Sequence, residues 1–318
     1  MKPKLRQSHL FSAVIAILLI SGCASQKFVY PDPGISVANL RETVGFLCAA
    51  NPPRDLEHPD SLQKAADYIL QRFRDHGLRP EFQEFQVGGN RYVNIMASAG
   101  PQDGARLIVG AHYDVCGSQP GADDNASAVA GLLEIARFAK QHEAELPGRI
   151  DFVAYTLEEP PTYATHRMGS YVHAESLHKQ KIEVRGMICL EMIGYFSGQK
   201  KSQEYPLSLL KWFYPSTGNF IGVVGNYGSS SLMKQVARHL GATAIPVETL
   251  RAPAFLQGVD FSDHRNYWAF DYDAVMVTDT AFFRNPNYHQ KTDTPDTLSF
   301  DKMAEVVKGL CWAILNMK

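Results

Sequence analysis

The sequence has few cysteines, almost no excess of charge and no apolar run long enough to span a membrane. Five cysteines in 318 residues, none in a CxxC pair, exclude a disulfide-stabilised scaffold and a zinc ribbon. A formal charge of −2 provides no general attraction to nucleic acid. The hydrophobic content of 45% is too high for a disordered chain. We therefore expect a folded chain that forms one large domain and does not bind nucleic acid.

An apolar stretch at residues 10–20 is typical of a signal peptide, because it is shorter than a helix that crosses a bilayer core of about 30 Å. Lys2, Lys4 and Arg6 precede it, and two small residues followed by Cys23 come after it. This ending resembles a bacterial lipobox, so residues 1–22 are predicted to be cleaved and Cys23 to carry lipid. Loss of the three cations changes the formal charge from −2 to −5. An ordinary signal peptide with a chance cysteine is the alternative.

The lipobox places the protein outside the cytoplasm, lipid-anchored on the periplasmic side of a bacterial membrane. Ala24, rather than Asp, after the cysteine favours the outer membrane. Residues 23–36 contain Pro31, Pro33 and Gly34 and are predicted to form a tether, which leaves residues 37–318 as a single folded domain. The other cysteines are predicted to be small buried side chains, although one disulfide is possible; they are Cys48, Cys116, Cys189 and Cys311.

Helical and strand-like periodicities alternate along the domain, which predicts an α/β layered sheet. Helices are predicted over residues 36–50, 60–76, 127–141, 230–240 and 299–316. Strands are predicted over residues 81–87, 91–97, 106–111, 150–157, 187–193, 220–224 and 274–278.

Histidine and carboxylate side chains, which can bind metal ions, lie at the ends of several of these strands. His112 and Asp114 follow the third strand, the Glu158-Glu159 pair follows the fourth, and Glu191 lies within the fifth. Ligands of open α/β sheets bind at the carboxyl ends of the strands, so we expect these residues to meet there. Each signal is weak alone, since a single histidine or acidic pair is common on a surface, but their joint occurrence predicts a metal site.

Histidine and carboxylate ligands suit Zn²⁺, and one catalytic zinc needs only three protein ligands. The larger number of candidates predicts two metal ions about 3.5–4 Å apart that share a carboxylate and a water molecule. Three carboxylates and a hydroxide would balance the charge of two zinc ions, which makes burial of the cluster tolerable. Such a centre still needs a base to accept a proton from the water.

The sequence resembles the zinc exopeptidase family of bacterial leucyl aminopeptidases and aminopeptidase Y, to which glutaminyl cyclases and glutamate carboxypeptidase II are related. The resemblance covers residues 37–318 and rests on the segments HYD, GADDNASA, EE, LEMIGY, SDH and YHQKTDTPDTL, which begin at residues 112, 121, 158, 190, 262 and 288. It implies a three-layer α/β/α sandwich with a mixed, mostly parallel central sheet. It also implies a zinc metallopeptidase that releases N-terminal residues from peptide substrates.

The resemblance assigns five metal ligands. His112 and Glu191 correspond to ligands of the first zinc, Glu159 and His289 to ligands of the second, and Asp124 to the carboxylate that bridges them. Two zinc ions per chain are therefore expected.

Three further residues take roles from the same resemblance. Glu158 corresponds to the general base that accepts a proton from the zinc-bridging water and delivers it to the leaving amine. Asp114 corresponds to a carboxylate that orients the His112 ring, and Tyr288 to a tyrosine that hydrogen-bonds the substrate carbonyl or its oxyanion. The Asp263-His264 pair lies near the site in the family and is given no direct metal role.

The chain departs from the family pattern in three places. Glu191 stands where many members have Asp, which can alter the metal geometry. The loop 160–168 is longer than usual and contains His166, which we interpret as a rim residue rather than an extra ligand. The aromatic-rich segment 195–220 is interpreted as a lid or pocket wall, with a packed surface excursion as the alternative.

Alternative functions remain open. A glutaminyl cyclase-like acyltransferase with a single zinc shares Asp, Glu and His ligands with the peptidases. Exopeptidases of other specificity, including carboxypeptidase-like action, use the same motifs. A non-catalytic binding lipoprotein is disfavoured because relatives of that kind lack metal ligands. The preferred substrate residue and the oligomeric state do not follow from the sequence.

Overall fold

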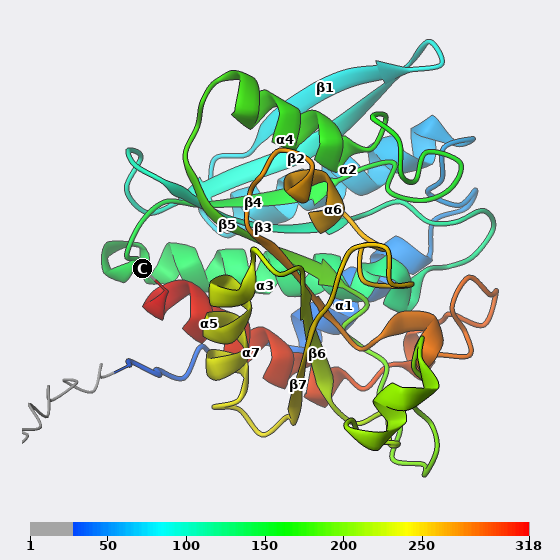
Figure 1. The fold of residues 1–318 in the computed structure, drawn as a ribbon. Coiled ribbons are helices and arrows are strands. Elements are labelled where there is room, and N and C mark those ends of the chain that lie inside the picture. Colours follow the sequence, from blue (N-terminus) through cyan, green and yellow to red (C-terminus); the bar gives the residue numbers. More distant parts are fainter. Residues whose placement is uncertain (1–27, 318) are drawn as a thin grey trace, which may run out of the picture.

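An eight-stranded mixed sheet runs through the protein, of which the computed structural model describes residues 28–317 (Figure 1). Its order is β1-β2-β4-β3-β5-β8-β6-β7. The four central strands are parallel: β4 (Ile150–Tyr155), β3 (Arg106–His112), β5 (Val184–Glu191) and β8 (Ala274–Thr278). One edge continues with antiparallel β2 (Asn90–Ala99) and β1 (Glu81–Val87), and the other with β6 (Ile221–Gly225), antiparallel to β8, and β7 (Val247–Arg251).

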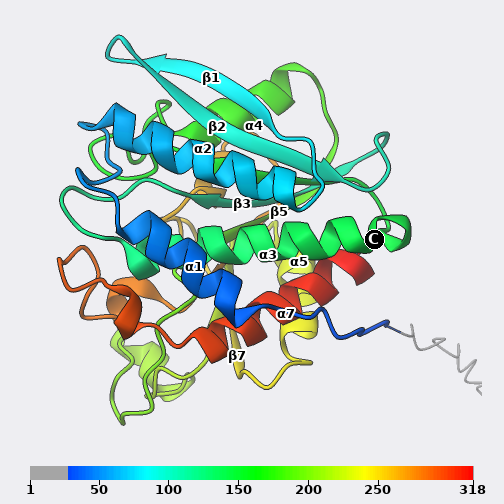
Figure 2. The ribbon, with the colours of Figure 1, turned by 180° about the vertical axis from the view of Figure 1, so that it is seen from behind.

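Helices cover both faces of the sheet. One face, shown in front in Figure 2, carries α1 (Val37–Cys48), α2 (Pro59–Asp75), α3 (Ala128–Gln141) and α7 (Phe300–Asn316), and α5 (Ser230–Leu240) packs against α7. The other face carries α4 (Gly169–Lys179) and the short α6 (His264–Trp268). Alternate residues of the strands enter the two resulting cores, as Val109 and Ile108 do on β3. The predicted three-layer sandwich is confirmed.

Every predicted helix and strand is present, whereas α4, β7 and α6 were not predicted. The edge strand β7 is only partly buried along its length, so no clean apolar alternation marks it in the sequence. Helix α6 has five residues, which is too short for a periodic signal. Helix α4 buries polar Ser170 and His173 together with few apolar residues, so its inward face resembles a surface helix in sequence.

The described part of the predicted tether lies against the domain. The side-chain amide of Asn316 bonds both the N–H and the C=O of Val29, and the Trp312 indole N–H donates to Pro31 O. Arg137 on α3 donates to Gly34 O at 2.8 Å. The tether predicted for residues 23–36 therefore includes a stretch, residues 29–34, that is bound to α7 and α3. The predicted signal peptide and Cys23 lie outside the described residues.

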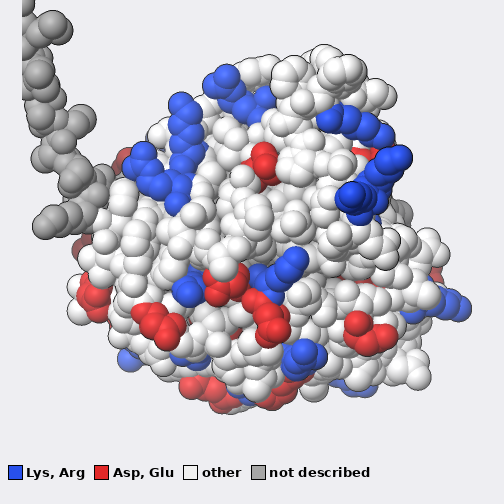
Figure 3. All heavy atoms as spheres, turned by 90° about the horizontal axis from the view of Figure 1, so that it is seen from below, with Lys and Arg blue, Asp and Glu red and all other residues white. Residues whose placement is uncertain are grey.

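Charged side chains of both signs share the face shown in Figure 3, with wide uncharged areas between them. On this face, Lys and Arg lie mainly toward the top of the view, and Asp and Glu mainly toward the bottom. Within residues 28–317, no helix is long and apolar enough to cross a membrane.

Two glycines provide opposite tests of the packing. A Cβ atom on Gly110 of β3 would lie 2.3 Å from Tyr155 Cε2, whereas a Cβ on Gly45 of α1 would meet nothing within 4 Å. We expect Gly110→Ala to lower the free energy of unfolding by about 1–3 kcal/mol through overpacking. Gly45→Ala should raise it by about 0.4–1 kcal/mol through loss of unfolded-chain entropy. Urea denaturation measures both, and a neutral Gly110→Ala would contradict the close packing of β3 on β4.

Candidate metal centre

The connection from β3 to α3 brings Asp124 to the carboxyl ends of the central strands. Arg54 is 1% exposed and holds this connection by donating to the carbonyl oxygens of Tyr113, Pro120 and Gly121. The chain then forms a π-helical turn, Ala122–Ser127, in which the Asp124–Asn125 peptide bond is cis. A buried cation thus fixes both ends of the loop that precedes the turn.

Two other segments hold this turn from the outside. The Asn125 amide donates to Leu190 O at the end of β5, and its oxygen accepts the N–H of Met192. The Asp293 carboxylate accepts the backbone N–H groups of Asp123 and Asp124 at 2.9 and 3.1 Å. The position of Asp124 is therefore set by the end of β5 and by the segment that follows His289.

The two oxygens of Asp124 face two different histidines. Asp124 Oδ1 lies 3.5 Å from His112 Nε2, and Asp124 Oδ2 lies 3.2 Å from His289 Nε2. Glu191 Oε2 is 3.4 Å from His112 Nε2, and Glu159 Oε2 is 3.3 Å from His289 Nε2. The structure thus brings the five predicted ligands together as two groups that share Asp124.

These residues fit a pair of zinc ions. Ligands of a tetrahedral Zn²⁺ with bonds of about 2.0–2.1 Å are separated by about 3.3 Å, which is close to all four of these distances. The fit is supported by buried polar atoms that have no hydrogen-bond partner within the described residues, namely Asp124 Oδ2, Glu159 Oε1, His112 Nδ1 and His289 Nε2. Unpaired buried polar atoms are costly, and a bound cation would satisfy the carboxylate oxygens and the Nε2 atom among them.

The Asp114 carboxylate connects the histidine of one strand to the glutamates of the next. Its two oxygens accept the backbone N–H groups of Glu158 and Glu159, both at 3.1 Å, and Oδ1 lies 3.4 Å from His112 Nδ1. Asp114 therefore lies next to the His112 ring, without a hydrogen bond to it among the described residues, and its orienting role stays a prediction. Glu158 Oε2 is 3.9 Å from His112 Nε2, so Glu158 lies beside the predicted ligands and itself forms a candidate ligand group with His112 and Glu159.

Three residues at the site have a left-handed backbone, which is unfavourable for residues other than glycine. They are Leu157, Met192 and His289, with φ of 61°, 49° and 56°. Leu157 directly precedes the glutamate pair, Met192 directly follows Glu191, and His289 is itself a candidate ligand. Such conformations cost about 1–3 kcal/mol each and persist only where the surroundings enforce them.

Ser262 contacts a metal ligand and was not predicted. Its hydroxyl donates to Glu191 Oε2 at 2.6 Å, and Cys189 Sγ lies 3.1 Å from Ser262 Oγ. The bond fixes one oxygen of a carboxylate that has one methylene more than the usual Asp. The SDH segment was the available signal, but the sequence does not show which ligand it reaches. The neighbouring His264 bonds Val259 O instead, in agreement with no direct metal role.

The electrostatics of the cluster favour a bound cation. Burial raises the pKa of Glu158 well above its ordinary value. Burial and the Asp124 carboxylate raise the pKa of Glu159 to about 8. Burial alone would lower the pKa of His289, but its contacts with Asp124 and Glu159 raise it to about 10. Without a metal, Glu158, Glu159 and the His289 ring therefore favour their protonated forms, whereas the two histidines lower the pKa of Asp124. A divalent cation would displace the protons of the first three groups.

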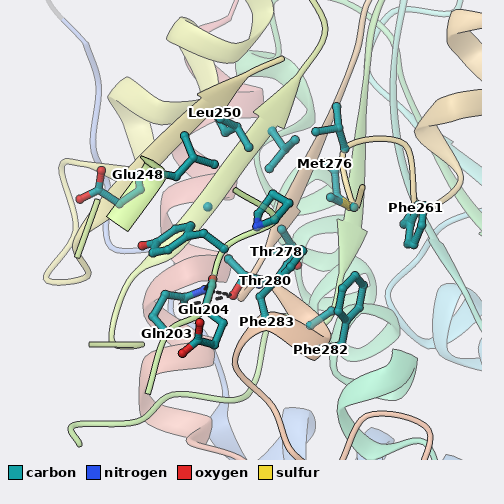
Figure 4. A pocket seen from close by; sticks show the side chains of 18 of the residues that line it. Gln203, Glu204, Glu248, Leu250, Phe261, Met276, Thr278, Thr280, Phe282 and Phe283 are labelled. Carbon is teal, nitrogen blue, oxygen red and sulfur yellow. Dashed lines mark hydrogen bonds between the residues drawn. The ribbon is translucent and has the colours of Figure 1, made fainter. Parts of the chain in front are cut away.

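A mostly apolar cavity of about 90 Å³ adjoins the metal centre, and Glu191 and Tyr288 line it. The Tyr288 ring stacks on His289, with ring centroids 3.8 Å apart, so it stands between the ligands and the cavity. The apolar walls of the cavity are shown in part in Figure 4 and include Phe220, Val224, Leu250, Met276 and Phe282. The cavity is large enough to receive an apolar side chain.

The interpretation of segment 195–220 as a pocket wall is confirmed in part. Tyr205, Tyr214 and Phe220 line the cavity, but Trp212 is 84% exposed and lies outside the lining. In the loop 160–168, His166 is exposed and belongs to none of the candidate ligand groups, which agrees with its interpretation as a rim residue.

The prediction that four cysteines are buried small side chains is wrong for two of them. Cys189 and Cys311 are buried, but Cys48 and Cys116 are only partly buried, and all four are free thiols. Cys116 lies beside the metal centre, because its Sγ and ligand atoms of Glu159 and His289 are all within 4.8 Å of one another.

Comparison with known proteins identifies the family. Residues 94–313 match the profile described as Peptidase family M28. The chain belongs to peptidase family M28. The uncharacterized protein YfbL of Escherichia coli is 43% identical over 292 residues, which covers 89% of each chain. Leucine aminopeptidase 1 of Coccidioides posadasii is 26% identical over 243 residues, which covers 72% of this chain but only 56% of that longer protein.

Solved structures share the fold of this M28 peptidase. LapA aminopeptidase of Legionella pneumophila gives a TM-score of 0.70 at 21% identity, with 89% of this chain and 70% of that chain covered. Glutaminyl cyclase of Bacteroides thetaiotaomicron gives 0.69 at 18% identity, with 91% and 100% covered. The fold is therefore common to aminopeptidases and cyclases and does not distinguish between them.

Proposed function

We propose that this M28 peptidase is a dinuclear zinc aminopeptidase that hydrolyses the first peptide bond of peptides. The observation that carries the proposal is the position of Asp124 between two histidine–carboxylate pairs at tetrahedral spacing. When bound, zinc lowers the pKa of a water ligand and polarises the scissile carbonyl group. The leucine aminopeptidase among the relatives supports this substrate class.

Side chains of the protein transfer the proton, stabilise the developing charge and attract the substrate. Glu158 accepts the proton of the attacking water and delivers it to the leaving amine, since its backbone is held by Asp114 and its side chain lies beside the ligands. Tyr288 lies between the ligands and the cavity and donates a hydrogen bond to the oxygen that gains charge. The carboxylates attract the α-ammonium group of the substrate, which gives preference for free N-termini.

The cavity next to Glu191 receives the side chain of the first substrate residue. Its walls are largely apolar, so leucine, methionine and phenylalanine gain from burial there. Glu204 and Glu248 also line the cavity (Figure 4), which disfavours acidic side chains by repulsion between like charges. The enzyme therefore prefers large apolar N-terminal residues.

The lipid anchor at Cys23 and the periplasmic location, with the outer membrane favoured, are part of the same proposal. They rest on the sequence pattern of residues 1–24. In this view the domain acts on peptides outside the cytoplasm. A non-catalytic binding role is less consistent with the site, because all the predicted ligands converge.

The proposed base can be tested by removing only its charge. Glu158→Gln should retain zinc but lower kcat by about 10²–10⁴-fold, because the amide cannot accept the proton. Hydrolysis of leucyl peptides and zinc content measure the two effects. Glu175→Gln on α4 serves as the control and should leave turnover unchanged, because Glu175 pairs with Lys179 and belongs to none of the candidate ligand groups. Near-normal turnover of Glu158→Gln would refute the assignment.

The number of metal ions distinguishes the peptidase from a glutaminyl cyclase-like enzyme, the second candidate, which has the same fold. Two zinc ions per chain are expected, because His112 and His289 each have carboxylate partners at ligand spacing. Equilibrium dialysis gives the stoichiometry, and mass spectrometry of peptides with N-terminal glutamine shows whether a residue is released or ammonia is lost. One zinc together with ammonia loss would favour the cyclase.

The pocket assignment predicts a change of specificity. Met276→Trp should fill the cavity and raise KM for leucyl and phenylalanyl peptides, with little effect on alanyl peptides, because a methyl group needs little of that space. Trp212→Ala is the matched control, since Trp212 lies outside the lining, and its profile should equal that of the unaltered chain. An unchanged profile in Met276→Trp would show that the side chain binds elsewhere.

A further inference from the structure

Cys116 lies at the second metal position with its sulfur toward the ligands of that position. It follows β3 in the chain, two residues after Asp114, in the connection that Arg54 holds. Its Sγ, a Glu159 carboxylate oxygen and a His289 ring nitrogen are mutually within 4.8 Å. No other of the four cysteines in the described residues belongs to a candidate ligand group.

The neighbouring donor atoms point to a ligand at this place independently of the cysteine. Glu159 is 4% exposed and its Oε1 has no hydrogen-bond partner. Asp124 Oδ2 and His289 Nε2 are likewise without partners, although they lie 3.2 Å apart. Buried unpaired atoms on these three residues, two of which lie next to the thiol, indicate a cation site rather than a hydrogen-bonded cluster.

We propose that Cys116 is a fourth protein ligand of the second metal ion, in addition to Asp124, Glu159 and His289. Thiolate, imidazole and carboxylate form a donor set that Zn²⁺ prefers over harder cations. Coordination forms a bond between sulfur and the metal and releases the thiol proton to solvent. This proposal rests on the metal-binding part of the proposed function and does not depend on the substrate.

A fourth ligand makes the two positions unequal. The first position has three protein donors, His112, Asp124 and Glu191, and so keeps an open site for water or substrate. The second position has four donors and is close to a closed, structural type of zinc site. The second position therefore fills first as metal is added, and the first position completes the catalytic centre.

Cobalt absorption tests the sulfur ligand without relying on activity. Co²⁺ added to the metal-free full chain should give visible d–d bands and, in addition, a near-ultraviolet thiolate-to-cobalt charge-transfer band. Cys116→Ser should lose the charge-transfer band, and Cys48→Ser, the matched control at the other partly buried thiol, should keep it. Visible bands without the charge-transfer band in the unaltered chain would overturn the role of Cys116 while leaving the metal centre intact. Absence of all cobalt bands would overturn the metal centre itself and this proposal with it.

A second measurement uses the unaltered chain and so does not depend on the folding of a variant. Iodoacetamide labelling, located by peptide mass spectrometry, should modify both Cys116 and Cys48 in the metal-free protein. Zn²⁺ should protect Cys116 and leave the labelling of Cys48 unchanged. Equal labelling of Cys116 with and without Zn²⁺ would overturn the proposal.

Discussion

Burial of four carboxylates at one sheet edge is the constraint on which the rest of the site depends. Asp124, Glu158, Glu159 and Glu191 are each no more than 6% exposed. Such a cluster is tolerable only if protons or cations neutralise it, and the chain itself supplies two histidines and the buried Arg54 nearby. The remaining negative charge favours the binding of a divalent cation. A bound cation would therefore stabilise the folded chain as well as take part in the chemistry.

Backbone geometry, more than side-chain length, places the ligands. Parallel pairing of β4, β3, β5 and β8 brings their carboxyl ends to one edge. Hydrogen bonds from Asn125 and Asp293 then connect the turn that carries Asp124 to segments distant in the chain. The backbone is left-handed at Leu157, Met192 and His289, which precede, follow or include candidate ligands, so the local conformational preference is overridden at the site.

Several features specific to the surroundings of the ligands adjust the predicted metal centre. Glu191 has a longer side chain than the usual Asp, and the hydrogen bond from the Ser262 hydroxyl fixes the position of its carboxylate. Cys116 adds a soft donor beside Glu159 and His289, which gives the two metal positions different chemistry. The cavity next to Tyr288, which we propose to receive the first substrate residue, has mostly apolar walls. The cavity walls thus come from strands β6, β7 and β8 as well as from loops.

The order of strands and helices, the sandwich fold and the type of ligands were determined by the sequence alone, because periodicity and polar residues at strand ends are local signals. The individual ligands His112, Asp124, Glu159, Glu191 and His289 were assigned through the resemblance to a known family, and the structure brings them together. Tertiary structure alone decided the contact of Ser262 with Glu191, the position of Cys116 and the docking of residues 29–34 on α7. These depend on contacts between segments up to 287 residues apart, for which a single sequence carries no local pattern.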